Sequence, residues 1–269
     1  MISRFRHASR AILGAREYQE DACAFAFPDA RALYFTTSGK VNGTGELLAV
    51  LADGMGGPVA GAEAARTACR SFIEAYTAER EAEDRLKLAL DRSNAAIGTA
   101  VATDRRLEGM GSTLLAVAFG EGGLTWVSVG DSPLYLFRDK HLYQLNQDHS
   151  LAPVLDQLAA DGEMEPEVAL QHPRRHYLRS ALTGSGIDLV DLRDDVFALR
   201  PRDWVVLASD GIDSLEPGLF ADILAHYAEA DPDTMARALI EAVEAQANPA
   251  QDNTTIMAVK PCFHALAVA

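Results

Sequence analysis

The chain has 269 residues, of which 39 are Asp or Glu and 24 are Lys or Arg, so its formal net charge is −15. This acidity argues against a nucleic-acid-binding surface, which needs clustered Lys and Arg, and no segment reaches the ~20 apolar residues of a membrane span. Three widely spaced cysteines, Cys23, Cys69 and Cys262, favour free thiols over disulfides or a cysteine-based zinc site, and we therefore expect a cytoplasmic protein.

Short apolar runs rich in Val, Leu, Thr and aromatic residues predict strands along most of the chain. These runs are residues 32–39, 45–53, 112–120, 124–131, 133–139, 141–145, 195–199, 203–211 and 254–260. Several are joined by short turn sequences such as "GEGG" and "RDK", which is typical of antiparallel sheets.

Helical periodicity occurs in an early and a late group. The early group has one apolar stripe formed by Ala65, Ala68, Cys69, Phe72 and Tyr76, and another formed by Leu86, Leu90, Ile97 and Val101. The late group covers residues 219–230 and 232–247, with Asp231 and Pro232 as a helix start. Strand runs separated by helix pairs predict an α+β domain in which helices pack outside antiparallel sheets.

Residues 151–178 are more polar and less regular than the segments around them. Their pattern fits either a mobile flap or a plain surface insertion.

Acidic residues recur beside the predicted strands. Asp53, Asp131 and Asp210 end strands, and Asp252 precedes one. Each alone is typical of a turn or capping residue. If the fold brings these strand ends together, the four carboxylates repel one another unless cations lie between them. Oxygen ligands of this kind favour Mg²⁺ or Mn²⁺ over zinc.

Two further features accompany the acids. Gly54 follows Asp53, and the absence of a Cβ either permits a tight turn or lets a backbone carbonyl approach a metal. Arg16 precedes Glu20 and Asp21, so its guanidinium either forms a surface salt bridge with them or grips a phosphate.

Six motifs stand in the order found in one enzyme family: "REYQEDA", "LADGMGGPVAGAEAA", "GMGSTLLAVAF", "VSVGDSPLYLFRDKHLYQLNQDHS", "LASDGI" and "QDNTTIMAV". The chain thus resembles the metal-dependent Ser/Thr protein phosphatases of the PPM, or protein phosphatase 2C, family. "DGMGG" in place of "DGHGG" is similar to the bacterial branch. The resemblance implies a four-layer α-β-β-α sandwich, with two antiparallel sheets flanked by helix pairs. It spans a single domain over residues 9–260, and residues 151–178 fall at the family's variable flap.

The resemblance also implies a metal centre. Asp53 corresponds to the ligand that bridges two metals, and the Gly54 carbonyl corresponds to a ligand of one of them. Asp210 and Asp252 correspond to ligands that complete the other site. Bacterial relatives often hold a third, weaker ion, for which Asp131 and Asp210 match the ligands. The implied cofactors are Mn²⁺ or Mg²⁺, two per active site and a third in such relatives.

By the same resemblance, Arg16 binds the substrate phosphate, while Glu20 and Asp21 order metal-bound water. The implied reaction is hydrolysis of phosphoserine and phosphothreonine by direct attack of a hydroxide that bridges two metals. Many relatives have a histidine at the position of Met55, where it is proposed to protonate the leaving group. Because a thioether cannot donate a proton, that role is vacant here or belongs to metal-bound water.

Two other functions stay open at this stage. One is a catalytically silent phosphatase fold used as a regulatory module, although none of the motif acids is missing. The other is a phosphomonoesterase for small molecules. The expected partners are phosphorylated proteins and a cognate Ser/Thr kinase, with neither nucleic acid nor a membrane among them.

Overall fold

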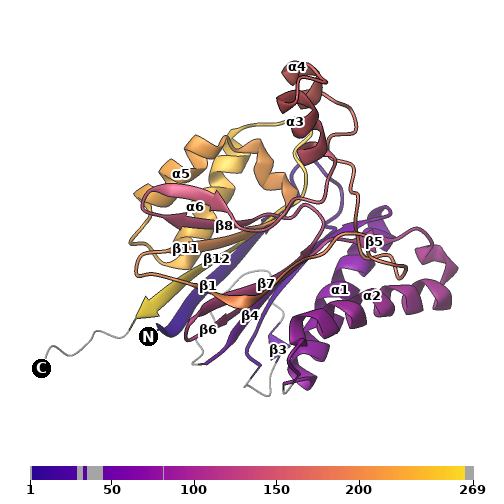
Figure 1. The fold of residues 1–269 in the computed structure, drawn as a ribbon, viewed down its shortest axis with the longest axis horizontal. Coiled ribbons are helices and arrows are strands. Elements are labelled where there is room, and N and C mark those ends of the chain that lie inside the picture. The colour runs from indigo at the N-terminus through magenta and orange to yellow at the C-terminus, as the bar shows by residue number, and fades with distance from the viewer. Residues whose placement is uncertain (1, 29–32, 35–44, 81, 264–269) are drawn as a thin grey trace, which may run out of the picture.

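The computed structural model describes residues 2–28, 33–34, 45–80 and 82–263, and their elements form two antiparallel sheets (Figure 1). The first sheet has the order β1 (Ile2–Ile12), β12 (Thr254–Phe263), β11 (Trp204–Ala208), β8 (Leu134–Arg138) and β9 (His141–Gln144). The second has the order β10 (Asp191–Ala198), β7 (Gly123–Val129), β6 (Leu114–Gly120), β4 (Leu47–Met55), β2 (Asp21–Ala26) and β3 (Leu33–Tyr34). A short strand, β5 (Gly111–Ser112), pairs with β4 beside this row.

Helix pairs cover the outer face of each sheet, which confirms the predicted four-layer sandwich (Figure 1). The second sheet carries α1 (Pro58–Ala78) and α2 (Arg85–Thr103), and the first carries α5 (Pro217–His226) and α6 (Pro232–Ala245). Two short helices, α3 (Ala152–Ala160) and α4 (Pro166–Leu170), project from one end of the molecule. The 3-10 turns are η1 (Arg105–Leu107) and η2 (Asp210–Ser214). Among the described residues, no helix combines the length and the apolar character that crossing a membrane requires.

The apolar residues of β4 show how one strand serves two layers. Leu47 and Leu51 lie in the cluster between the sheets, whereas Leu48 and Val50 lie in the cluster beneath α1. Successive side chains of a strand point to opposite faces, so a strand covered on both faces needs an uninterrupted apolar run. The sequence "LLAVLA" is such a run.

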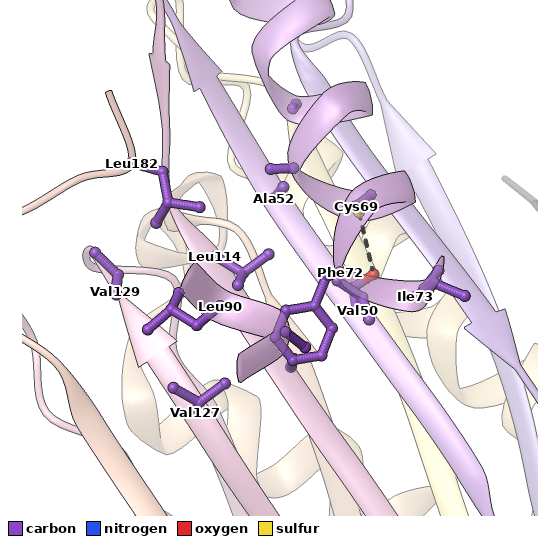
Figure 2. Close-up of a cluster of buried hydrophobic side chains, with 14 of the residues drawn as sticks. Val50, Ala52, Cys69, Phe72, Ile73, Leu90, Leu114, Val127, Val129 and Leu182 are labelled. Carbon is purple, nitrogen blue, oxygen red and sulfur yellow. Dashed lines mark hydrogen bonds between the residues drawn. The ribbon is translucent and has the colours of Figure 1, made fainter. Parts of the chain in front are cut away.

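The predicted stripes of the early helix pair form the outer apolar layer shown in Figure 2. Phe72 of α1 and Leu90 of α2 are fully buried against the sheet. Cys69 also faces the sheet, where its Sγ atom donates to the carbonyl oxygen of Val50 at 3.7 Å. Asp231 caps α6, as predicted, by accepting from the backbone N–H groups of Asp233 and Thr234.

Several boundaries differ from the predictions. The sequence analysis predicts neither β1 nor β2. Strand β1 carries Arg4, Arg6 and Arg10, so it reads as a basic segment rather than an apolar one. Strand β4 continues two residues beyond Asp53, so this acid lies within the strand. Segment 151–178 contains α3 and α4 rather than irregular chain. Of the predicted strand 32–39, only residues 33–34 lie among the described residues.

Candidate metal centre

Four aspartates from both sheets line one cavity of about 520 Å³, which we name the acidic cavity. Asp53 lies near the end of β4, and Asp131 follows β7 by two residues. Asp210 begins η2 directly after β11 and Ser209, and Asp252 precedes β12. The four acids are far apart in the chain, and the fold brings them to one cavity, as expected if the strand ends meet. Arg16, Glu20 and Gly54 line the same cavity.

Hydrogen bonds with Ser112 and Thr113 fix the backbone of Asp53. Its N–H donates to the hydroxyl of Thr113 at 2.9 Å, and its carbonyl oxygen accepts from the Thr113 N–H at 2.8 Å. The hydroxyl of Ser112 donates to the same carbonyl at 3.0 Å. Ser112 and Thr113 therefore position Asp53 rather than act as nucleophiles.

Asp21 lies behind the acidic cavity, opposite Asp53 in the register of β2 and β4. One of its carboxylate oxygens accepts from the hydroxyls of Ser209 at 2.8 Å and Thr255 at 2.7 Å. Thr255 lies in β12 and Ser209 directly follows β11, so Asp21 of the second sheet is tied to the first sheet beside the cavity. Burial raises the pKa of Asp21 to about 7, although these two hydrogen bonds oppose the shift.

The lining carboxyls are too crowded to be ionised together without compensation. Burial is the largest cause that raises the pKa of Asp53 well above its ordinary value, and the neighbouring aspartates add to it. Burial and the charge of Asp210 raise the pKa of Asp131 to about 8. The pKa of Asp210 is raised by burial and by the charge of Asp252, while a hydrogen bond with Asp53 opposes that shift. A cation among them would remove this repulsion.

Unused oxygen atoms agree with a cation site. Oδ1 of Asp210, Oδ1 of Asp21 and Oε1 of Glu20 are buried and accept no hydrogen bond from any described residue. Buried oxygens of this kind call for a partner, and carboxylate oxygens are the ligands that Mg²⁺ and Mn²⁺ prefer. Within the described part of the chain, no three His, Cys, Asp or Glu side chains already stand in a metal-holding arrangement. The unpartnered carboxylate oxygens and their burial nevertheless fit divalent metals.

Gly54 is required by close packing at the start of α1. A Cβ at Gly54 would overlap the carbonyl oxygen of Gly61, and one at Gly61 would overlap Oε1 of Glu20. The chain then turns through Gly56 and Gly57, with φ of 117° and 90°, which favour glycine. The glycines therefore let α1 begin directly against the cavity, with Gly54 in its lining.

Arg16 forms its ion pair with Asp252, which is distant in sequence, rather than with the nearby Glu20 or Asp21. Its Nη2 atom donates to Oδ2 of Asp252 at 2.5 Å, and half of its side chain is exposed. The alternative of a salt bridge to Glu20 or Asp21 is not what the structure shows. A guanidinium on the open side of the acidic cavity is placed to meet an anion that enters from solvent.

Asn253 and His176 are among the lining residues that the sequence analysis did not identify. The Asn253 amide donates to the carbonyl oxygens of Leu13 and Tyr18, and its Oδ1 atom accepts from the Glu20 N–H. It thus fixes the loop that carries Arg16. His176 comes from segment 151–178, which is remote in sequence from every predicted ligand. In the sequence, the one indication of such a histidine was that Met55 cannot donate a proton, which left the proton donor unassigned.

Comparisons with known proteins agree with this geometry. A family model described as "Protein phosphatase 2C" matches residues 34–244. The serine/threonine phosphatase stp of Listeria welshimeri is 34% identical over 177 residues, which are 63% of this chain and 68% of that protein. The serine/threonine protein phosphatase PstP of Mycobacterium tuberculosis is 35% identical over 171 residues, 62% of this chain and 32% of the relative.

Solved structures extend the likeness to almost the whole chain. The crystal structure of the Mycobacterium tuberculosis serine/threonine phosphatase PstP/Ppp has a TM-score of 0.76 and 29% identity, covering 97% of this chain and 100% of that one. A crystal structure of the PstP catalytic domain in complex with two manganese ions has a TM-score of 0.73 and 28% identity, covering 97% and 99%.

Proposed function

The chain belongs to the protein phosphatase 2C family and is a protein serine/threonine phosphatase, and we propose that the acidic cavity hydrolyses its substrates by direct attack of water on phosphorus. The observation that carries this mechanism is the convergence of Asp53, Asp210 and Asp252, from both sheets, on one cavity. The raised pKa values of Asp53 and Asp210, with the charge of Asp252 beside them, favour a cation-binding site.

In this proposal, Asp53 and the Gly54 carbonyl would hold one divalent ion, and Asp53, Asp210 and Asp252 would hold another. Asp131 joins Asp210 at a third, weaker position. The ions are Mn²⁺ or Mg²⁺, and when bound they supply a water that ionises near neutral pH and neutralise charge on the phosphate oxygens. Because water attacks directly, no cysteine or serine nucleophile is needed.

The other residues act on the substrate and on the ligands. Arg16 binds the phosphate from the open side of the cavity and offsets the charge that spreads over its oxygens in the transition state. The Asp252 carboxylate holds Arg16 in place until substrate or metal competes for it. Glu20 and Asp21 stand behind the ligands and orient water there.

We treat residues 9–260 as a single phosphatase domain, with residues 151–178 as its flap-like insertion, hereafter the flap. The substrates are phosphorylated proteins, and the proposed partner is a Ser/Thr kinase whose products this enzyme dephosphorylates. Cytoplasmic location stays a prediction from the cysteines.

The test is release of inorganic phosphate from a phosphothreonine peptide by the full chain, with Mn²⁺, with Mg²⁺ and with excess chelator. We expect turnover with either metal and none with chelator. Turnover that survives chelator would overturn the mechanism. A folded, manganese-binding protein inactive on every phosphomonoester would identify a regulatory module, and activity on small phosphorylated metabolites alone would identify a small-molecule phosphomonoesterase.

A further inference from the structure

The leaving oxygen of a phosphoserine or phosphothreonine substrate must gain a proton, and the structure points to a donor for it. Met55 lines the acidic cavity, but its thioether has no proton to give. We propose that His176, at the base of the flap, donates this proton. The inference rests on the proposed function, because it assigns a role within the same reaction.

The base of the flap is a fixed part of the fold. Ser150 and Leu178 form an antiparallel bridge, and the Leu151 N–H donates to the carbonyl oxygen of Tyr177 at 3.0 Å. On the other side of His176, the Arg175 guanidinium makes a two-bond ion pair with Asp156 of α3, at 2.7 and 2.8 Å. The residues on both sides of His176 are therefore tethered, and its backbone is held at the rim of the cavity.

The His176 side chain is available to contact a substrate. It lines the acidic cavity and is exposed, and it makes no hydrogen bond or ion pair with any described residue. In this respect His176 differs from two other histidines, His149 and His172. The ring of His149 is buried and accepts from the Gly130 N–H at 3.2 Å, and the ring of His172 accepts from the Arg174 N–H at 3.2 Å.

Electrostatics place His176 close to the proposed ligands. Burial and the charge of Asp210 raise the pKa of Asp213 to about 6, and the charge of His176 opposes this rise. His176 acts on Asp210 in the same direction, against the raising effects of burial and Asp252. Asp210 and Asp213 of η2 therefore interact electrostatically with the imidazole, and Arg175 precedes it in the flap.

Other cavity groups are poorer donors. The Arg16 guanidinium already donates to Asp252. The lining aspartates are assigned to metals, whose binding keeps them ionised. Tyr177 carries a phenol, a side chain that transfers protons in enzymes less often than histidine does. Histidine is the side chain that most often transfers protons there.

The step balances as follows. Water attacks phosphorus, the bond from phosphorus to the Ser or Thr oxygen breaks, and its electron pair stays on that oxygen. The ring N–H of cationic His176 gives its proton to the oxygen, which leaves as the free hydroxyl. The water's displaced proton goes to solvent, and the neutral imidazole takes a proton from solvent before the next turnover.

The experiment compares the full-chain wild type with His176→Gln at saturating Mn²⁺, on substrates whose leaving groups differ in basicity. A phosphothreonine peptide releases a basic alkoxide and needs the donor, whereas p-nitrophenyl phosphate releases a weakly basic phenolate. We expect kcat to fall about 100-fold on the peptide and about 3-fold or less on the aryl ester. The matched control is His172→Gln, a flap histidine outside the cavity, which should match wild type on both.

The outcomes separate the two proposals. If wild type fails to hydrolyse the peptide, the proposed function fails. If wild type succeeds and His176→Gln loses equally on both substrates, or on neither, His176 is not the donor. A loss confined to the peptide in Tyr177→Phe, with none in His176→Gln, would transfer the role to Tyr177. Circular dichroism and the Mn²⁺ midpoint of each variant show whether it is folded and loaded.

Discussion

His7 and Asp53 are both enclosed by the two sheets, His7 in the apolar layer between them and Asp53 in the acidic cavity at their end. His7 packs against Phe25 and Phe27, with ring centroids 4.4 and 5.5 Å away. Both of its ring nitrogens are buried without a hydrogen-bond partner among the described residues. Asp53 instead lies among other carboxyls on a cavity open to solvent.

The two regions show that burial alone does not create a site. A single ionisable group in an apolar layer stays neutral, so it leaves no charge for a cation to offset. If several carboxyls buried together all became neutral, some of their polar atoms would be left without hydrogen-bond partners, which is unfavourable. Such a group of carboxyls therefore favours a bound cation. If this contrast is right, changes in the acidic cavity alter activity and metal response, and changes at His7 alter stability alone.

The largest effect is expected for Asp53→Asn, which removes one negative charge and one oxygen ligand. Loss of a metal-bridging ligand should lower kcat about 10³-fold at saturating Mn²⁺, or about 4 kcal/mol of transition-state stabilisation. In metal-free protein the same variant should melt at the wild-type temperature or above, because repulsion is relieved. Asp139→Asn, an exposed acid in the β8–β9 turn, is the control. Near-normal turnover of Asp53→Asn would remove Asp53 from the ligand set.

The second prediction concerns pH in metal-free protein. Asp21 and Asp131 have pKa values of about 7 and about 8 in the folded protein, far above ordinary aspartate. The folded state therefore binds more protons than the unfolded chain between about pH 4 and pH 8, and stability falls as pH rises through that range. We expect urea unfolding in chelator to show a loss of several kcal/mol, which Mn²⁺ restores most strongly at pH 8. A flat profile would mean that the carboxyls do not repel one another.

The third prediction tests the apolar layer and has the opposite sign. Burial lowers the pKa of His7 to about 4, so the unfolded chain binds a proton first and stability falls as pH drops from about 6.5 to 4. His7→Leu should remove about 3 kcal/mol of this acid sensitivity. The difference in unfolding free energy between variant and wild type, measured at each pH, isolates His7 from the carboxyls. Turnover at pH 7 should not change, and a changed Mn²⁺ midpoint would contradict the separation of the two regions.

The smallest effect is expected for Arg16→Ala. Arg16 is exposed on the open side of the cavity, so its loss should raise KM about tenfold, or about 1.4 kcal/mol, and change the Mn²⁺ midpoint less. Arg16→Lys keeps the charge but not the two-pronged geometry, and should recover part of the loss. A shift in metal affinity larger than the shift in KM would show that Arg16 serves Asp252 rather than the substrate.

Local pattern was sufficient for much of the fold. The predicted apolar stripe from Ala65 to Tyr76 lies within α1, and each of its members is buried. The run before Asp53 is apolar at every position because both faces of β4 are covered. These features depend on neighbours within a few residues, which is why periodicity and turn residues identify them.

The tertiary structure alone decided the remainder. Strand β1 is recognised only through β12, with which Ile12 pairs at Thr254. Arg16 meets Asp252 although 236 residues separate them, and His176 enters the cavity from the flap. The sequence determined which side chains could bind a divalent cation and which segments could be strands or helices. Which of those side chains share one cavity depended on the packing of the two sheets, because contacts between distant segments leave no local periodicity to read.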